Sequence, residues 1–214
     1  MAEDALKQAI DAGVRQYVVL GAGLDTFAYR NPYPGLRVFE VDHPATQRWK
    51  RERLENARIA VPQDVTFVAA DFDITMEPLP AILLAAGLRI HEPSFFSWLG
   101  VTPYLESATV LSTLRAMATL AANGGGVVFD YFISPEFLGA RQRAGFEALA
   151  ARVAAAGEPF RASFEPSTLM ARISEMGFRR IRDLGPDELN ATFFSNRSDG
   201  LHVGGFGRIL TAFK

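Results

Sequence analysis

Two glycines and an acidic residue follow an apolar run near the start of the chain. In the stretch VVLGAGLDTFAYR, residues 18–30, Gly21 and Gly23 flank Ala22 where a strand is expected to end. Glycine lets the backbone turn sharply and lets a ligand come close. A dinucleotide-binding loop would have a third glycine where Thr26 stands, so the spacing disfavours a nicotinamide cofactor. We interpret the segment as a ligand-binding loop, with a plain tight turn as the alternative, and expect a side chain at Gly21 to block the ligand without disturbing the fold.

Asp42 is the acidic residue best suited to a second contact with such a ligand. It follows the predicted strand RVFEV and lies 19 residues after Gly23 (42 − 23). A carboxylate about 20 residues beyond a glycine loop is typical of a group that binds ribose hydroxyls. Alternatively, Asp42 caps the helix that Pro44 begins, and the two roles are compatible.

Further candidate side chains follow the other predicted strands. Asp71 comes after the third strand and could accept a hydrogen bond from an adenine amino group, with Phe72 covering the ring; a solvated turn acid is the alternative. Tyr104 and the pair Asp130-Tyr131 are placed with the fourth and fifth strands at the ligand edge, where they could line a substrate pocket or pack its rim. The three histidines are not at metal-ligand spacing, so we predict no metal site and assign no catalytic residue.

Seven strands and the helices between them are predicted to position these residues. Strands are predicted at 17–20, 37–41, 65–69, 94–99, 127–132, 179–184 and 206–213. Helices are predicted at 5–12, 44–58, just before Gly87, 107–122, 135–156 and 169–176. The alternation implies one α/β domain over residues 1–214, with a mainly parallel sheet, helices on both faces, and the last two strands pairing antiparallel across a polar loop. In such sheets, ligands bind beyond the carboxyl ends of the strands, near the first strand.

The composition argues against several classes of protein. A net charge of −2 over 214 residues gives no electrostatic footprint for nucleic acid or an anionic membrane. The absence of cysteine excludes disulfides and thiolate metal sites, and makes a cytoplasmic protein the expectation. The charged start MAEDALKQAIDAG is not typical of a signal peptide, and no apolar segment is long enough to cross a bilayer.

Five segments in order resemble the leucine carboxyl methyltransferase family, most closely its actinobacterial branch related to polyketide O-methyltransferases. They are LGAGLDTFAYR (20–30), VFEVDHPATQRWK (38–50), AADF (69–72), SWLGVTPYL (97–105) and VVFDYF (127–132). The resemblance covers essentially the whole chain and implies the Rossmann-like fold of class I methyltransferases. It also implies S-adenosyl-L-methionine as the cofactor, bound at Gly21, Asp42, Asp71 and Phe72. We expect Ala22, Gly23 and Leu99 to complete that site.

Two departures from the family pattern shape the expected function. Members that methylate protein phosphatases carry a glutamate where Leu99 stands, which favours a small-molecule acceptor here. Members also carry helices before the segment at Ala5, so we expect a short N-terminus and an open cofactor site. The predicted activity is methyl transfer to a carboxylate or hydroxyl oxygen; since no general base stands out, a carboxylate or acidic phenol is preferred. The alternatives are a non-catalytic protein that binds S-adenosyl-L-methionine and a nicotinamide-dependent oxidoreductase.

Overall fold

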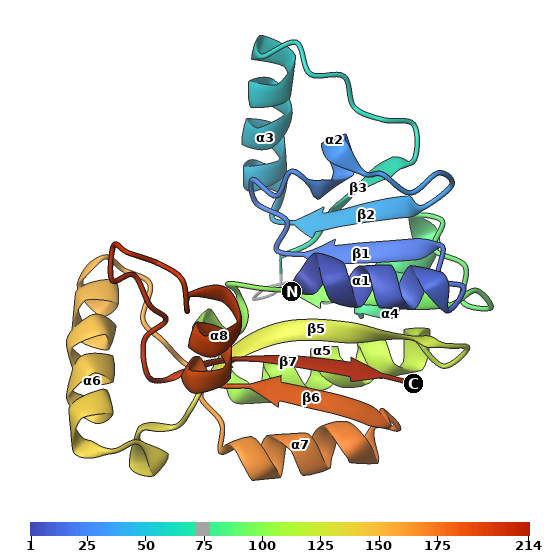
Figure 1. Cartoon of the computed structure of the whole chain (residues 1–214). Helices are drawn as coiled ribbons and strands as arrows, with labels where there is room; N and C mark the ends of the chain where they lie inside the picture. Colours follow the sequence, from blue (N-terminus) through green and yellow to red (C-terminus); the bar gives the residue numbers. More distant parts are fainter. Residues whose placement is uncertain (72–77) are drawn as a thin grey trace.

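A seven-stranded sheet forms the centre of the protein, seen here in a computed structural model that describes residues 1–71 and 78–214 (Figure 1). Its strand order is β3-β2-β1-β4-β5-β7-β6. The first five strands run parallel, and β7 lies antiparallel between β5 and β6. The strands are β1 (Gln16–Leu20), β2 (Arg37–Asp42), β3 (Val65–Ala69), β4 (Ser94–Trp98), β5 (Gly125–Phe132), β6 (Arg180–Leu184) and β7 (Gly207–Phe213). The predicted α/β sheet with an antiparallel C-terminal edge is confirmed.

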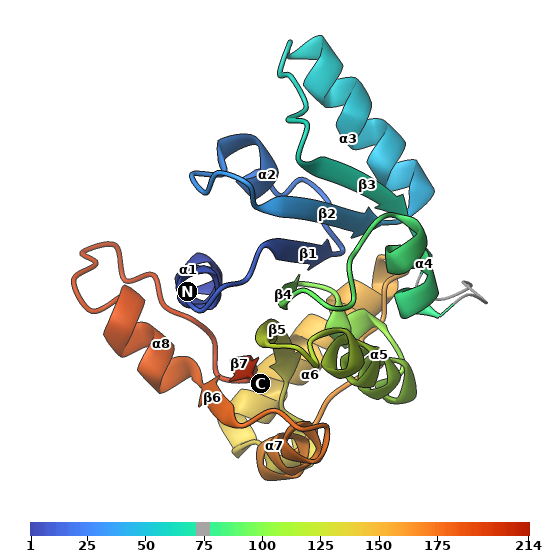
Figure 2. The same cartoon turned by 90° about the vertical axis from the view of Figure 1, so that its right-hand side faces the viewer.

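Helices cover both faces of this sheet (Figure 2). The helices α1 (Ala2–Asp11) and α2 (Phe27–Arg30) pack on one face. On the other face lie α4 (Leu79–Ala85), α5 (Ser107–Leu120) and α7 (Pro166–Glu175). The remaining helices are α3 (Pro44–Asn56), α6 (Ala140–Ala155) and α8 (Pro186–Phe193), with 3-10 turns at Thr102–Tyr104 and Pro135–Phe137. Among the residues described, no helix is long and apolar enough to cross a membrane.

Alternate residues of the central strands contact the two layers of helices. Tyr17 and Phe95 belong to the core under α1, whereas Leu20 and Trp98 belong to the core under α5. Successive side chains of a strand point to opposite faces of the sheet. A strand covered on both sides must therefore be apolar at nearly every position, which explains the uninterrupted apolar runs in the sequence.

The segment between the last two strands differs from the predicted polar loop because it contains α8. Pro186 lies in the first turn of this helix, and the Glu188 carboxylate accepts a hydrogen bond from the Gly185 N–H at 3.0 Å. Both features are typical of a helix N-terminus. The buried side chain of Leu189 anchors the helix to the protein. Helix α6 also begins later than predicted, at Ala140.

A buried ion pair joins α3 to β2. The Lys50 ammonium lies 2.8 Å from the Glu40 carboxylate, and both side chains are almost completely buried. The Tyr29 hydroxyl donates a hydrogen bond to the same carboxylate at 3.3 Å. Burial raises the pKa of Glu40, although the neighbouring Lys50 ammonium opposes that rise. Glu40 is two residues before Asp42. This ion pair therefore fixes β2 to α3 close to the carboxyl end of the strand, where a ligand is predicted to bind.

Replacing Lys50 alone is expected to destabilise the protein strongly. Lys50→Met would leave the Glu40 carboxyl buried without its counter-charge, which should lower the free energy of unfolding by about 3–5 kcal/mol. The double variant Glu40→Gln, Lys50→Met removes both charges and should lose much less. Denaturant unfolding at neutral pH measures both values. A Lys50→Met variant as stable as the wild type would contradict this interpretation.

The carboxylate of Glu165 caps α7. It accepts hydrogen bonds from the Ser167 N–H at 3.0 Å, the Thr168 N–H at 2.6 Å and the Ser167 hydroxyl at 2.7 Å. These donors lower the pKa of Glu165 to about 2 from its ordinary value of 4.5. A carboxyl whose pKa is lowered by folding stabilises the protein above its unfolded pKa, and this stabilisation is lost as the pH falls through the folded value.

The variant Glu165→Gln should therefore be less stable than the wild type at neutral pH. The difference in free energy of unfolding should be complete above pH 4.5 and should shrink as the pH falls from 4.5 towards 2, where the wild-type carboxylate takes up a proton. Denaturant unfolding over this pH range tests the expectation. Glu158→Gln, which changes an exposed glutamate that caps no helix, is the control. A stability difference that does not depend on pH would exclude the carboxylate as its source.

Candidate functional site

The glycine loop folds back onto the end of β2. The N–H groups of Gly21 and Ala22 both donate to the carbonyl oxygen of Val41, at 2.8 and 3.1 Å. Gly21 and Gly23 have φ values of +65° and +39°, a left-handed conformation that favours glycine. A Cβ built on Gly21 would lie 2.2 Å from Cγ2 of Val101. A side chain at Gly21 would therefore strain the fold, because Gly21 packs against the segment after β4; that the fold survives such a change stays a prediction.

Asp42 connects the end of β2 to this loop. One carboxylate oxygen accepts a hydrogen bond from the N–H of Gly23, and the other accepts from the N–H of His43 at 2.6 Å. His43 is the residue that caps α3, since its Nδ1 accepts from the N–H of Ala45 at 3.1 Å. The capping role considered for Asp42 thus falls to His43. The half-buried Asp42 carboxylate faces the glycine loop.

Asp71 lies beside the same site, directly after β3. Its carboxylate is 3.5 Å from Nε2 of His43, and its side chain keeps 28% of its surface exposed. The N–H of Ala70 donates to the Asp42 carbonyl oxygen at 2.9 Å, so the ends of β2 and β3 are in register. The structure therefore brings Asp42 and Asp71 together around His43. Phe72, predicted to cover the adenine ring, lies outside the described residues.

The ends of β4 and β5 are joined by another carboxylate. Asp130 accepts a hydrogen bond on Oδ1 from the N–H of Gly100 at 2.8 Å. Its carbonyl oxygen accepts from the Thr102 hydroxyl at 2.5 Å. Burial raises the pKa of Asp130. Leu99, adjacent to Gly100, keeps 37% of its surface exposed. Asp130 is one of the residues predicted from the sequence to line a substrate pocket, and that role stays a prediction.

The two tyrosines considered as substrate contacts differ in position. Tyr104 is exposed, and its ring packs against Phe160 at a centroid distance of 5.5 Å. Tyr131 lies instead in the core, where its hydroxyl donates to Asp183 at 2.9 Å. The same Asp183 oxygen accepts from Nε of Arg208 at 2.8 Å. Tyr131 is buried because it lies within β5, which ends at Phe132 as predicted, and because its ring belongs to the core under α5.

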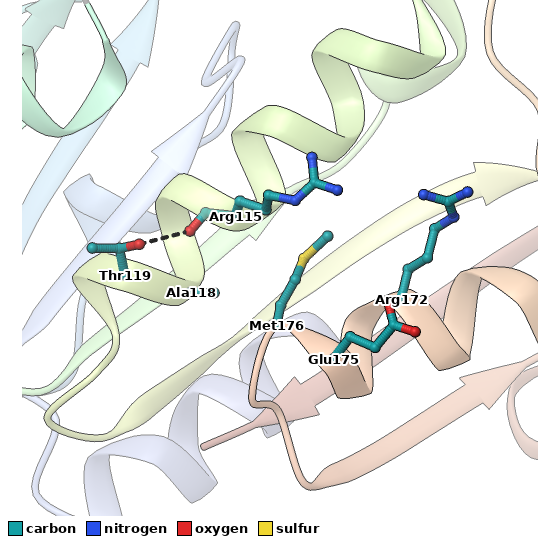
Figure 3. A pocket seen from close by; sticks show the side chains of 6 residues that line it. All are labelled: Arg115, Ala118, Thr119, Arg172, Glu175 and Met176. Atoms are coloured by element: carbon teal, nitrogen blue, oxygen red, sulfur yellow. Dashed lines mark hydrogen bonds between the residues drawn. The ribbon is translucent and has the colours of Figure 1, made fainter.

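A hollow of about 330 Å³ between α5 and α7 is separate from the carboxyl edge of the sheet, where the parallel strands end (Figure 3). It is lined by Arg115, Ala118, Thr119, Arg172, Glu175 and Met176. Helix α5 begins after β4 at the carboxyl edge of the sheet and returns to the amino edge before β5. Its later half, which lines the hollow, therefore lies toward the amino edge. None of the predicted site residues lines this hollow.

Comparison with known protein families shows which family the chain belongs to. The family model described as leucine carboxyl methyltransferase matches residues 1–118. The chain belongs to the leucine carboxyl methyltransferase family. YktD of Bacillus subtilis, whose name describes an S-adenosyl-L-methionine-dependent methyltransferase, is 36% identical over 201 residues. That match covers 93% of this chain and 65% of YktD, so this family member spans just under two thirds of the relative. It spans 45% of a second relative, from Frankia alni, whose name describes the same activity.

Solved structures show that this member of the family has the class I methyltransferase fold. The apo form of the S-adenosylmethionine-dependent methyltransferase SibL superposes with a TM-score of 0.59 at 18% identity, covering 99% of this chain and 54% of SibL. Human N-acetylserotonin methyltransferase in complex with S-adenosylmethionine superposes with a TM-score of 0.56 at 12% identity, covering 99% of this chain and 51% of the human protein. At these identities the likeness supports the fold alone.

Alanine substitutions at the two glycines should separate the cost of the left-handed backbone from the cost of overlap with Val101. Gly21→Ala should lower the free energy of unfolding by roughly 1–2 kcal/mol through its left-handed backbone and by about 1–3 kcal/mol more through overlap with Val101. Gly23→Ala should carry only the backbone cost, because its Cβ would meet only the Gly21 carbonyl oxygen, at 3.9 Å.

A double-mutant cycle with Val101→Ala checks the overlap by denaturant unfolding. In the Val101→Ala background, Gly21→Ala should cost about as much as Gly23→Ala does in the wild type. An unchanged cost for Gly21→Ala in that background would show that Val101 is not the obstacle.

Proposed function

We propose that this chain binds S-adenosyl-L-methionine along the carboxyl edge of β1–β4 and transfers its methyl group to an oxygen atom of a small molecule. The observation that carries the proposal is the position of the Asp42 carboxylate, held at the end of β2 by the N–H of Gly23. Membership of the leucine carboxyl methyltransferase family supports the reaction class. The chain spans only part of the length of its relatives, so their activity is a proposal for this chain.

The chemistry of the side chains at this edge fits the proposed cofactor. Ribose hydroxyls and an adenine amino group are hydrogen-bond donors, and Asp42 and Asp71 offer carboxylate acceptors on neighbouring strand ends. A carboxylate has about four lone-pair positions, so the two backbone N–H groups that bind Asp42 leave acceptor positions for hydroxyls. Apart from its chain neighbours, a Cβ at Gly23 would meet one atom of the described residues within 4 Å, so they leave the loop open at that point. These residues would hold the nucleoside part.

The chain would contribute mainly orientation to the reaction. When bound, the cofactor supplies a methyl group on a positively charged sulfur and is therefore already activated. The protein must hold an acceptor oxygen in line with that methyl group and keep water away. Leu99 and Gly100, at the end of β4, are the residues we assign to the boundary between cofactor and acceptor. The apolar side chain at position 99 favours a small-molecule acceptor over a protein carboxyl group.

Removing the Asp42 carboxylate should weaken cofactor binding. Asp42→Ala is expected to raise the Kd for S-adenosyl-L-methionine by about 5- to 150-fold, corresponding to about 1–3 kcal/mol for unpaired polar partners. Isothermal titration calorimetry with S-adenosyl-L-methionine measures the change. Asp64→Ala is the matched control because this exposed acid precedes β3 at the opposite edge of the sheet. An unchanged Kd in a folded Asp42→Ala variant would remove Asp42 from the site.

Methyl transfer itself can be tested without knowing the acceptor. The protein is incubated with isotopically labelled S-adenosyl-L-methionine and a small-molecule extract, and the products are analysed by mass spectrometry. The proposal expects label in small molecules, with less label from the Asp42→Ala variant than from Asp64→Ala. Cofactor binding with no labelled product would favour a binding protein over an enzyme.

A further inference from the structure

An apolar cavity of about 540 Å³ lies where the ends of β4 and β5 meet the start of β7. Helix α8 and the segment after it form the opposite wall, and Figure 1 shows α8 beside these strand ends. Most of the wall comes from the apolar side chains of Leu99, Leu189, Phe193, Phe194, Val203 and Ile209. Its volume is in the range of about 300–1,000 Å³ that is typical of small-molecule sites.

Asp130 is the acidic residue in this lining. Its Oδ1 accepts from the Gly100 N–H at 2.8 Å, and the N–H of Asp130 itself also favours the charged carboxylate. An acid that is largely buried against apolar side chains holds its negative charge at a cost, and burial accordingly raises the pKa of Asp130. The carboxylate is therefore suited to accept a hydrogen bond or a proton from a bound molecule.

The nearby arginine does not neutralise this acid. In the β5–β7 ladder, Asp130 pairs with Ile209 and Tyr131 pairs with Arg208. Adjacent residues of a strand point to opposite faces, so the Arg208 side chain leaves the sheet on the face opposite Asp130. There its Nε is paired with Asp183 at 2.8 Å. Arg208 and Met1 also line the cavity, but the Met1 ammonium is paired with Asp4 at 2.9 Å. The cavity therefore combines apolar walls with one acid, and the two cations in its lining are each paired with another carboxylate.

We propose that this cavity holds the methyl acceptor, that the acceptor is an uncharged apolar molecule with a hydroxyl group, and that Asp130 accepts the hydrogen bond of that hydroxyl. The inference rests on the proposed methyl transfer and names its substrate class. The hydrogen bond between Gly100 and Asp130 places the acid next to Leu99, at the boundary between the cofactor edge and the cavity. A hydroxyl held by Asp130 is thus held beside the proposed methyl donor.

A carboxylate acceptor fits this cavity poorly. It would bring a second negative charge beside Asp130 among apolar side chains, and like charges in such a place disfavour each other. A neutral hydroxyl instead donates a hydrogen bond to Asp130 and buries its apolar part against the walls. Of the two acceptors preferred from the sequence, a carboxylate and an acidic phenol, this proposal favours the phenol.

Asp130 also provides a destination for the proton released in the reaction. As the acceptor oxygen forms its bond to the methyl carbon, the carbon–sulfur bond breaks and its electron pair stays on sulfur. The hydroxyl proton moves to the Asp130 carboxylate, from which water can remove it after the product leaves. General bases of this kind increase reaction rates by about 10²- to 10⁴-fold.

A matched pair of probes tests the proposal by binding alone. The probes are 2-naphthol and 2-naphthoate, which share an aromatic frame and differ in carrying a neutral hydroxyl or a charged carboxylate. Titration at neutral pH with S-adenosylhomocysteine present measures both affinities. We expect the wild type to bind 2-naphthol at least about tenfold more tightly than 2-naphthoate, a difference of about 1.4 kcal/mol. Asp130→Asn should reduce this ratio about fivefold or more, chiefly by improving 2-naphthoate binding.

Two further variants connect the result to the cavity. Phe193→Ala removes part of the apolar wall and should weaken the binding of both probes. Asp187→Asn changes an exposed acid on α8 that does not line the cavity, and should leave the ratio unchanged. The affinity for S-adenosylhomocysteine, titrated separately, should be the same in Asp130→Asn and wild type.

The outcomes distinguish this inference from the proposed function. Cofactor binding with equal affinity for the two probes, with no probe binding, or with a ratio that Asp130→Asn leaves unchanged would overturn the assignment of the cavity and leave the cofactor site standing. Failure of S-adenosylhomocysteine to bind the wild type would count against the proposed function. A probe ratio that falls in Asp130→Asn and holds in Asp187→Asn would support the assignment.

Discussion

The hydrogen bond from the Gly23 N–H to the Asp42 carboxylate is the contact on which the carboxyl edge depends. It fixes the loop after β1 to the end of β2, and the Val41 carbonyl oxygen reinforces it by accepting from Gly21 and Ala22. A carboxylate used in this way organises the backbone before any ligand arrives. The position of the loop is therefore set by the folded protein, and a bound ligand would not have to order it.

The rest of the architecture keeps that contact in place. The buried Glu40–Lys50 pair holds β2 and α3 together immediately before Asp42, and His43 caps α3 immediately after it. Gly21 packs against Val101, which connects the same loop to the segment following β4. Three strand ends thus constrain one short loop, which explains why a single added methyl group at Gly21 is expected to strain the fold.

Much of the fold was predictable because burial on both faces leaves a strong pattern in the strands. The run at residues 94–98 is apolar or small throughout, as a central parallel strand requires. Helix α8 was missed although Pro186, its acidic first turn and the spacing of Leu189 and Phe193 indicate a helix. The polar residues around these positions are typical of a loop, and they obscure the helical spacing.

The candidate site was only partly predictable because side-chain positions depend on register and on distant neighbours. Carboxyl ends of parallel strands meet at one edge, so the proximity of Asp42 and Asp71 followed from the element order alone. The burial of Tyr131 depends on which residues pack against its face of β5, and the capping role of His43 depends on its local backbone conformation. The contact between Gly100 and Asp130 requires the exact offset of two strands and two loops, for which the sequence has no local signal.

The reversed direction of β7 has a consequence for how this family could diversify. Strands β1 to β5 end at the carboxyl edge, whereas β7 begins there, so the chain before β7 reaches the same edge late in the sequence. The carboxyl edge of the sheet is consequently formed by two separate stretches of the sequence, an early one that contains β1 to β5 and a late one that precedes β7. The family match over residues 1–118 includes β1 to β4 of the early stretch and stops before α8. Under the proposed function, substitutions in the late stretch would reshape one wall of the cavity while the glycine loop and Asp42 stay unchanged, so one cofactor-binding half would combine with many different acceptor walls.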